Sequence, residues 1–126
     1  MAQPSEYDRL PVMTKYAFGM LRRPANLPTI SEADVDRIQE GHMAHLRRLT
    51  AAGDLIVAGP FEEDTSLRGV LIFTTGSIER ARGLMGSDPS LVEGRLMLDF
   101  YTWDAPAGIR VGPAPRNPTD LDFQTD

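Results

Sequence analysis

Two histidines, His42 and His45, are the side chains best suited to proton transfer in this sequence. The chain contains no cysteine, which leaves histidine, carboxylate, arginine and tyrosine side chains for any chemistry and excludes a thiolate nucleophile. On a helical wheel His42 falls inside an apolar arc of about 60°, whereas His45 falls near its edge, where a ring can reach solvent. The arc is formed by Val35, Ile38, Leu46 and Leu49. His42 is therefore the polar member of a stripe that we expect to face a sheet.

Three roles are open to His42. It is a structural histidine if its ring bonds only a backbone carbonyl, and a general base or acid if a carboxylate orients the ring. It could also share a metal with His45, but no HExxH motif and no third ligand at a recognisable spacing occurs, so we expect no metal. Asp88 is the candidate partner for catalysis. Because Pro89 follows it, Asp88 also suits the N-cap of a short turn, and one carboxylate can serve both purposes.

Four further residues are candidates for contact with a substrate. Arg22 and Arg68 lie at the ends of predicted strands, where each guanidinium either holds an anionic group or faces solvent. Asp99 interrupts an apolar face of the last predicted strand, so it either lines a pocket or pairs with an arginine. Tyr16 lies in the first predicted strand, and its alternative role is packing. No GxGxxG, GxxxxGK[ST] or GxSxG motif occurs, so we expect no nucleotide cofactor and no serine hydrolase chemistry.

The elements that must position these residues alternate along the chain. Apolar and aromatic runs predict strands at 14–21, 55–61, 68–74 and 95–103, and Ser-capped segments predict helices at about 31–52 and 77–86. Asp88 and Pro89 are expected to start a turn or one more helical turn. We therefore expect an α+β fold of the ferredoxin-like split βαβ type. Its four-stranded antiparallel sheet would have the order 4-1-3-2, with two helices on one face.

The expected sheet has apolar side chains on both faces but helices for only one. The third strand alternates Val70 and Ile72 with Leu71 and Phe73, so both of its faces are apolar. A second copy of the chain is the simplest cover for the open face, and we expect a homodimer. The alternative cover is the C-terminal tail, 104–126, which is Pro-rich and mildly acidic. The tail 1–13 precedes the expected domain, 14–103.

Length and charge set the broad class of the protein. A chain of 126 residues with 41% hydrophobic and 25% charged residues is typical of one globular domain. The formal net charge of -5 argues against nucleic acid and against an anionic membrane surface as partners. No long apolar run and no signal-peptide pattern occurs, so we expect a cytoplasmic protein that acts on a small molecule.

The stretch from Tyr16 to Trp103 resembles the YciI family, also called the YCII-related domain. The order and spacing of several short motifs carry the resemblance: His42 in the first predicted helix, Leu55 to Phe61 (LIVAGPF), Ser87-Asp88-Pro89, and more weakly Arg68-Gly69 and Gly94-Arg95-Leu96. The resemblance implies a ferredoxin-like dimer of the dimeric α+β barrel type. It also implies that His42 and Asp88 form a pair in a pocket.

The resemblance favours a cofactor-independent small-molecule enzyme in which His42 is the general acid or base and Asp88 lies behind it. Elimination of HX suits a lone histidine base, and a dehydrochlorinase role is associated with some relatives. The alternatives are a non-catalytic ligand-binding or accessory dimeric module, and a cofactor-free oxygenase or cyclase by analogy with other dimeric α+β barrels. A cavity that reaches the His42 ring would favour an enzyme, whereas a ring sealed in the core would favour the module.

Overall fold

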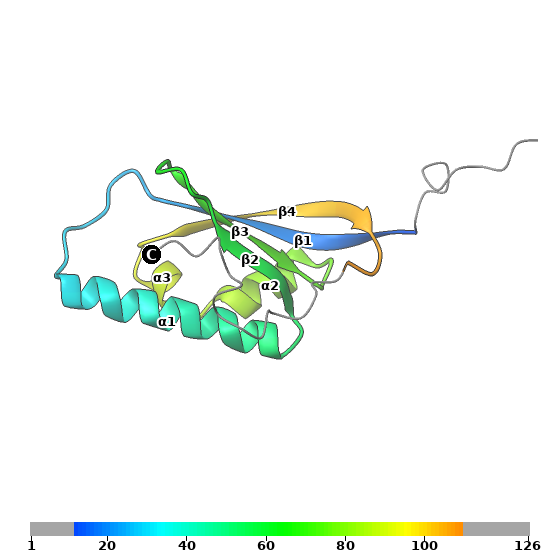
Figure 1. Ribbon diagram of the computed structural model, residues 1–126, viewed down its shortest axis with the longest axis horizontal. Coiled ribbons are helices and arrows are strands. Elements are labelled where there is room, and N and C mark those ends of the chain that lie inside the picture. Colours follow the sequence, from blue (N-terminus) through cyan, green and yellow to red (C-terminus); the bar gives the residue numbers. More distant parts are fainter. Residues whose placement is uncertain (1–11, 110–126) are drawn as a thin grey trace, which may run out of the picture.

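The computed structural model describes residues 12–109, which form a ferredoxin-like α+β fold with a four-stranded antiparallel sheet (Figure 1). The strands lie side by side in the order β2-β3-β1-β4, which confirms the order predicted from the sequence. In chain order the elements are β1 (Met13–Arg22), α1 (Glu32–Ala51), β2 (Leu55–Pro60), β3 (Leu67–Phe73), α2 (Ile78–Met85), α3 (Pro89–Val92) and β4 (Met97–Pro106).

Side-chain caps fix where the helices begin. The hydroxyls of Ser31 and Ser77 each accept a backbone N–H from the first turn of α1 and α2, both at 3.1 Å. α3 is the further helical turn, with Asp88 as its N-cap and Pro89 at its first position, where a proline costs no hydrogen bond. Among residues 12–109, none of the helices is both long enough and apolar enough to cross a membrane.

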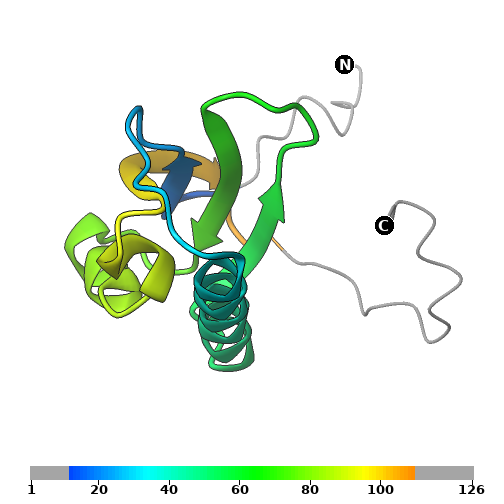
Figure 2. The ribbon, with the colours of Figure 1, turned by 90° about the vertical axis from the view of Figure 1, so that its left-hand side faces the viewer.

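The helices lie on one face of the sheet and close the core against it (Figure 2). Because side chains alternate along a strand, every second residue from Ala17 to Leu21 in β1 and from Gly69 to Phe73 in β3 points to the helices, and these residues are almost fully buried. The core is formed by Ala17, Leu21, Leu71 and Phe73 from the strands with Leu46, Leu49, Ala81 and Met85 from α1 and α2. Burial of this inner face fixes the register of the sheet.

No helix within residues 12–109 covers the opposite, outer face of the sheet. Aromatic side chains of β1 and β4 gather there, because the register places Tyr16 opposite Trp103 and Phe18 opposite Tyr101. Their ring centroids lie 6.2 Å and 6.4 Å apart, in tilted and edge-to-face contacts. Tyr101 is 56% exposed and Trp103 is 39% exposed, so an apolar aromatic surface remains accessible.

Two expectations need correction, one about the end of a strand and one about the inner face of a helix. β4 continues to Pro106, so residues 104–106, expected in the tail, belong to the sheet, and Ala105 is 1% exposed. Val35, expected in the inner stripe of α1, is 37% exposed, because residues 32–37 are all exposed and the core begins at Ile38. Residues 1–11 and 110–126 lie outside the described residues. The expectation that the C-terminal tail covers the sheet concerns these residues and stays a prediction.

We propose that a second copy of this chain covers the outer face. Tyr101→Glu would place a charge among these aromatic rings, where burial in a contact leaves it unpaired, and should convert the dimer to a monomer in sedimentation experiments at micromolar concentration. Val35→Glu, at an exposed apolar position on α1, should leave the dimer intact. A monomeric wild-type chain at the same concentration would reject the proposal.

Candidate active site

His42 projects from the inner face of α1 and is 6% exposed. Its Nδ1 lies 2.6 Å from Oδ2 of Asp88, which is fully buried at the start of α3. The contact between these two side chains is therefore present, at the distance expected of a charge-assisted hydrogen bond. The pair joins the longest helix to the segment after α2, across 46 residues of sequence.

Ser90 completes the surroundings of the Asp88 carboxylate. Its backbone N–H and its hydroxyl donate to Oδ1 of Asp88 at 2.9 Å and 3.0 Å, while His42 occupies Oδ2. Burial alone would raise the pKa of Asp88, but the hydrogen bonds from His42 and Ser90 outweigh it, so this pKa lies below its ordinary value. Asp88 is thus an ionised carboxylate that serves both as N-cap and as the partner of the histidine.

This arrangement determines which ring nitrogen of neutral His42 carries the proton. An ionised carboxylate can only accept hydrogen bonds, so Nδ1 must be the donor to Asp88. Nε2 then keeps its lone pair and is free to take a proton from a bound molecule. Ser90 lies on the Nδ1 side, with its hydroxyl 3.2 Å from that atom, so it is not placed as a nucleophile activated by Nε2.

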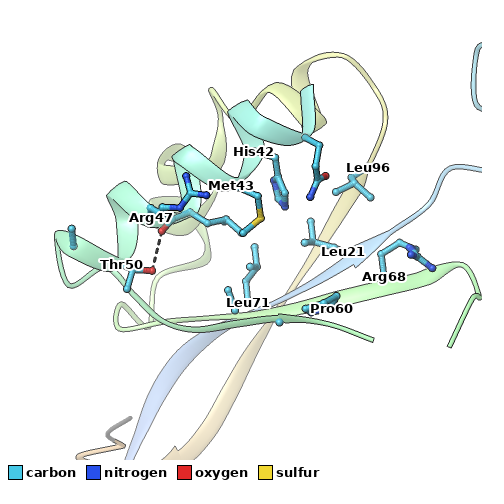
Figure 3. Close-up of a pocket in the computed structure, with 14 residues that line it drawn as sticks. Leu21, His42, Met43, Arg47, Thr50, Pro60, Arg68, Leu71 and Leu96 are labelled. Carbon is cyan, nitrogen blue, oxygen red and sulfur yellow. Dashed lines mark hydrogen bonds between the residues drawn. The ribbon is translucent and has the colours of Figure 1, made fainter. Parts of the chain in front are cut away.

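The ring of His42 lines a cavity of about 620 Å³ between α1 and the inner face of the sheet. Figure 3 shows the ring pointing from α1 toward Leu21 and the strands. We call this space the His42 cavity. Asp88 does not line it, so the carboxylate lies behind the ring. The walls are mostly apolar, with Leu21, Met43, Leu46, Ala58, Pro60, Leu71 and Leu96, and the polar lining residues are Gln39, His42, Arg47, Thr50 and Arg68.

A close approach of α1 and α3 holds the two halves of the pair together. Gly41 precedes His42, and a Cβ added at Gly41 would lie 2.8 Å from Cγ of Pro89. The proline ring is rigid and directly follows Asp88, so it cannot rotate away. The absence of a side chain at Gly41 therefore allows Asp88 to come within hydrogen-bonding distance of His42.

His45 is buried, which differs from the prediction made from the sequence. It was expected to reach solvent at the edge of the apolar arc, but it is 5% exposed because α2 packs beside it. Its Nε2 donates to the backbone carbonyl of Leu84 at 2.8 Å, and Arg48 donates to its Nδ1 at 3.2 Å. The structural role considered for His42, a buried ring bonded to a carbonyl, is therefore the role of His45. The two histidine rings bond different partners, and residues 12–109 contain no cluster of three potential metal-binding side chains.

Of the four substrate-contact candidates, Arg68 alone lines the His42 cavity. Arg22 and Asp99 pair with each other on the outer face, through Nε to Oδ2 and through Nη2 to Oδ1 at 3.2 Å. Each partner stabilises the charged form of the other, so the pKa of Arg22 is raised and that of Asp99 is lowered. Tyr16 is 6% exposed, packs against Trp103 and donates its hydroxyl to the carbonyl of Pro106 at 3.2 Å.

Four polar residues of the site were not expected from the sequence. Gln39, Arg47 and Thr50 line the cavity, and Gln39 stands three residues before His42, a spacing that places two side chains on one face of a helix. Ser90 stands two residues after the N-cap Asp88, where the backbone N–H meets the capping carboxylate. These two spacings are signals that could have identified Gln39 and Ser90.

Comparison with known proteins finds similarity among solved structures. No family model and no curated protein sequence matches the chain. Among solved structures, 5-chloro-2-hydroxyhydroquinone dehydrochlorinase from Burkholderia phenoliruptrix, in complex with 2,5-dihydroxybenzoquinone, is similar at 21% sequence identity, with 71% of this chain and 93% of that chain covered and a TM-score of 0.49. At this identity and TM-score the match says nothing about substrate or activity. The α+β fold stands on the strand order and helix placement of the chain itself.

Replacing Ser90 by alanine should destabilise the protein, because a fully buried carboxylate would lose one of its three donors. We expect Ser90→Ala to lower the free energy of unfolding by about 1–3 kcal/mol, measured by urea denaturation. Ser87→Ala, at an exposed serine of the same segment, is the matched control and should change it by less than about 0.5 kcal/mol. Equal stability of the Ser90 variant and the wild type would show that the hydroxyl is dispensable to Asp88.

Two glycines in helices should respond to alanine in opposite directions. Gly83 in α2 has nothing within 4 Å of an added Cβ, so Gly83→Ala should stabilise the protein by about 0.5–1 kcal/mol through the higher helix propensity of alanine. Gly41→Ala should instead destabilise it by about 1–3 kcal/mol, because Pro89 must shift. Calorimetric or urea unfolding of both variants measures the contrast. Stabilisation by Gly41→Ala would mean that α1 and α3 do not touch there.

Proposed function

We propose that this chain is a YciI-like enzyme that uses His42 as a general base, and then as an acid, on a small organic molecule. The observation that carries the proposal is the 2.6 Å contact between His42 Nδ1 and Asp88 Oδ2, on a ring that lines a cavity of about 620 Å³. A histidine that served only the core would be enclosed by packed side chains, as His45 is. The cavity beside the His42 ring therefore favours an enzyme over a non-catalytic module.

The first step is binding of the substrate with an acidic C–H or O–H at Nε2 of His42. The apolar walls exclude water, which strengthens electrostatic interactions inside the cavity. Nε2 takes the proton, and the ring becomes an imidazolium whose Nδ1–H remains hydrogen-bonded to the negatively charged Asp88. This opposite charge at close range stabilises the protonated ring, and the donors from Ser90 hold the carboxylate in place.

The composition of the cavity wall favours elimination. The substrate reacts as a tautomer in which the carbon that bears the leaving group is sp3. The electron pair of the broken C–H or O–H bond then forms a new C=C or C=O bond, and the leaving group departs with the electron pair of its own bond. The described residues that line the cavity include the imidazole of His42 but no carboxyl, thiol or phenol. A second general acid is therefore missing from the lining, and a leaving group that departs as a stable anion, such as chloride, needs none. The proton on His42 then returns to water.

The neighbour's substrate provides a direct assay for this reaction. We expect the protein to release chloride from 5-chloro-2-hydroxyhydroquinone, measured by ion chromatography under nitrogen. His42→Ala should reduce the rate by roughly 10²–10⁴-fold, the usual contribution of a general base. Asp88→Asn should cause a smaller loss, because the asparagine retains one acceptor oxygen but no charge. Arg80→Gln, on the surface of α2, is the control and should leave the rate unchanged.

Each outcome of this assay has a distinct meaning. No chloride release by the wild type would contradict dehydrochlorination. Release that persists at full rate in His42→Ala would contradict the role of the histidine, even with the Asp88 contact present. In a parallel assay in air, consumption of dioxygen or ring closure that depends on His42, without chloride release under nitrogen, would assign the cofactor-free oxygenase or cyclase alternative instead.

A further inference from the structure

A second, smaller space of about 170 Å³ adjoins the His42 cavity. The two spaces share Gln39, Arg68 and Leu96 in their walls, so they lie on opposite sides of these side chains. We call the smaller one the side pocket. It lies between the first half of α1 and the loops that flank β1 and β4, and its wall includes Arg23 and Arg95 in addition to Arg68.

The side pocket brings together three arginines from different parts of the chain. Arg23 follows β1, Arg68 lies in β3, and Arg95 precedes β4. No carboxylate lines the side pocket or the His42 cavity among the described residues, although the whole chain has a net charge of -5. The two spaces are therefore an electropositive region on an acidic protein, which favours entry of an anion.

The arginines are only partly neutralised. Asp64, with a side chain that is 83% exposed, accepts Arg23 Nη2 at 2.8 Å and Arg68 Nη1 at 3.4 Å. These two guanidinium groups hold the pKa of Asp64 below its ordinary value. The side chain of Arg95 donates Nη1 to the carbonyl of Pro28 at 3.1 Å, a neutral partner that leaves its charge uncompensated. Among residues 12–109, three positive charges thus line the side pocket against the exposed charge of Asp64, while the buried Asp88 lies behind Ser90 of the same wall.

We propose that the side pocket binds a carboxylate of the substrate while the apolar body of the same molecule occupies the His42 cavity. This inference rests on the proposed function and narrows the substrate class to an apolar monocarboxylate whose reacting proton lies at Nε2 of His42. The assay compound 5-chloro-2-hydroxyhydroquinone has no carboxylate, so it tests the chemistry in the His42 cavity alone. A guanidinium presents parallel N–H donors that match the two oxygens of a carboxylate, and the wall of the larger cavity suits a ring or alkyl chain. Because Arg68 lines both spaces, a molecule in the His42 cavity that reaches this guanidinium also reaches the side pocket.

The probes that test this proposal are 2-naphthoate and 2-naphthamide, which have the same ring system and nearly the same shape but differ in charge. We expect isothermal titration to give at least tenfold tighter binding of the acid than of the amide. Arg95→Gln and Arg23→Gln should each weaken binding of the acid about fivefold to tenfold and leave the amide unchanged. Arg80→Gln is the matched control outside both spaces and should bind the acid as the wild type does.

Three results would overturn the proposal. One is equal affinity for the acid and the amide, and another is no binding of the acid at millimolar concentration. The third is a loss of acid binding in Arg47→Gln but not in Arg23→Gln or Arg95→Gln, which would move the anion to the helical wall of the larger cavity. Circular dichroism of each variant establishes that it is folded.

The experiment separates this inference from the proposed function, because binding does not need turnover. His42→Ala should still prefer the acid, since the ring is not one of the groups that hold the carboxylate. Preference for the acid in a chain without catalytic activity would support the proposed substrate class and contradict the proposed reaction. Equal binding of the two probes in a chain with His42-dependent turnover would contradict the proposed substrate class alone.

Discussion

The buried carboxylate of Asp88 is the constraint on which this structure depends. A fully buried negative charge is tolerated only when donors surround it, and Asp88 receives three, from His42 and from the backbone and hydroxyl of Ser90. To supply them, α3 must begin immediately after Asp88 and α1 must approach it within van der Waals contact, which the glycine at position 41 permits. The same three donors that stabilise the charge also fix the tautomer of His42, so stability and chemistry share one set of hydrogen bonds.

Much of this arrangement could be predicted because it follows from local sequence. The caps Ser31 and Ser77 mark the helix starts, and the alternation of apolar residues marks the strands, so the order of elements leaves few ways to pair the sheet. The inward stripe of the first helix and the turn after the second place His42 and Asp88 in the same layer, and the resemblance to the YciI family implied their contact. His45 could not be placed in this way, because its burial depends on α2 packing over the edge of the stripe.

Arg22 and Asp99 lie away from the His42 cavity for one physical reason. They belong to strands whose two faces are both apolar, and sequence alternation does not tell which face meets the helices. The structure places Leu21 in the wall of the His42 cavity and Arg22, the next residue of the same strand, on the outer face. Asp99 pairs there with Arg22, which is one of the two roles that the sequence left open for it. Arg95 escaped notice for a related reason, since it lies beside a strand end far from Arg23 and Arg68 in the sequence and no periodicity links them.

The two faces of the sheet differ in what they contribute: the inner face lines the cavities, and the outer face holds an aromatic cluster. The His42 cavity and the side pocket are lined from the helices, the strand faces that meet them and the flanking loops, whereas the aromatic cluster of Tyr16, Phe18, Tyr101 and Trp103 lies on the opposite face. A partner docked on the outer face would therefore lie across the sheet from the cavity. An effect of association on the chemistry would pass through strands such as β1 and β3, where successive residues serve the two faces. A change in the twist of β1 would move Leu21 against His42 and Arg22 against Asp99 together.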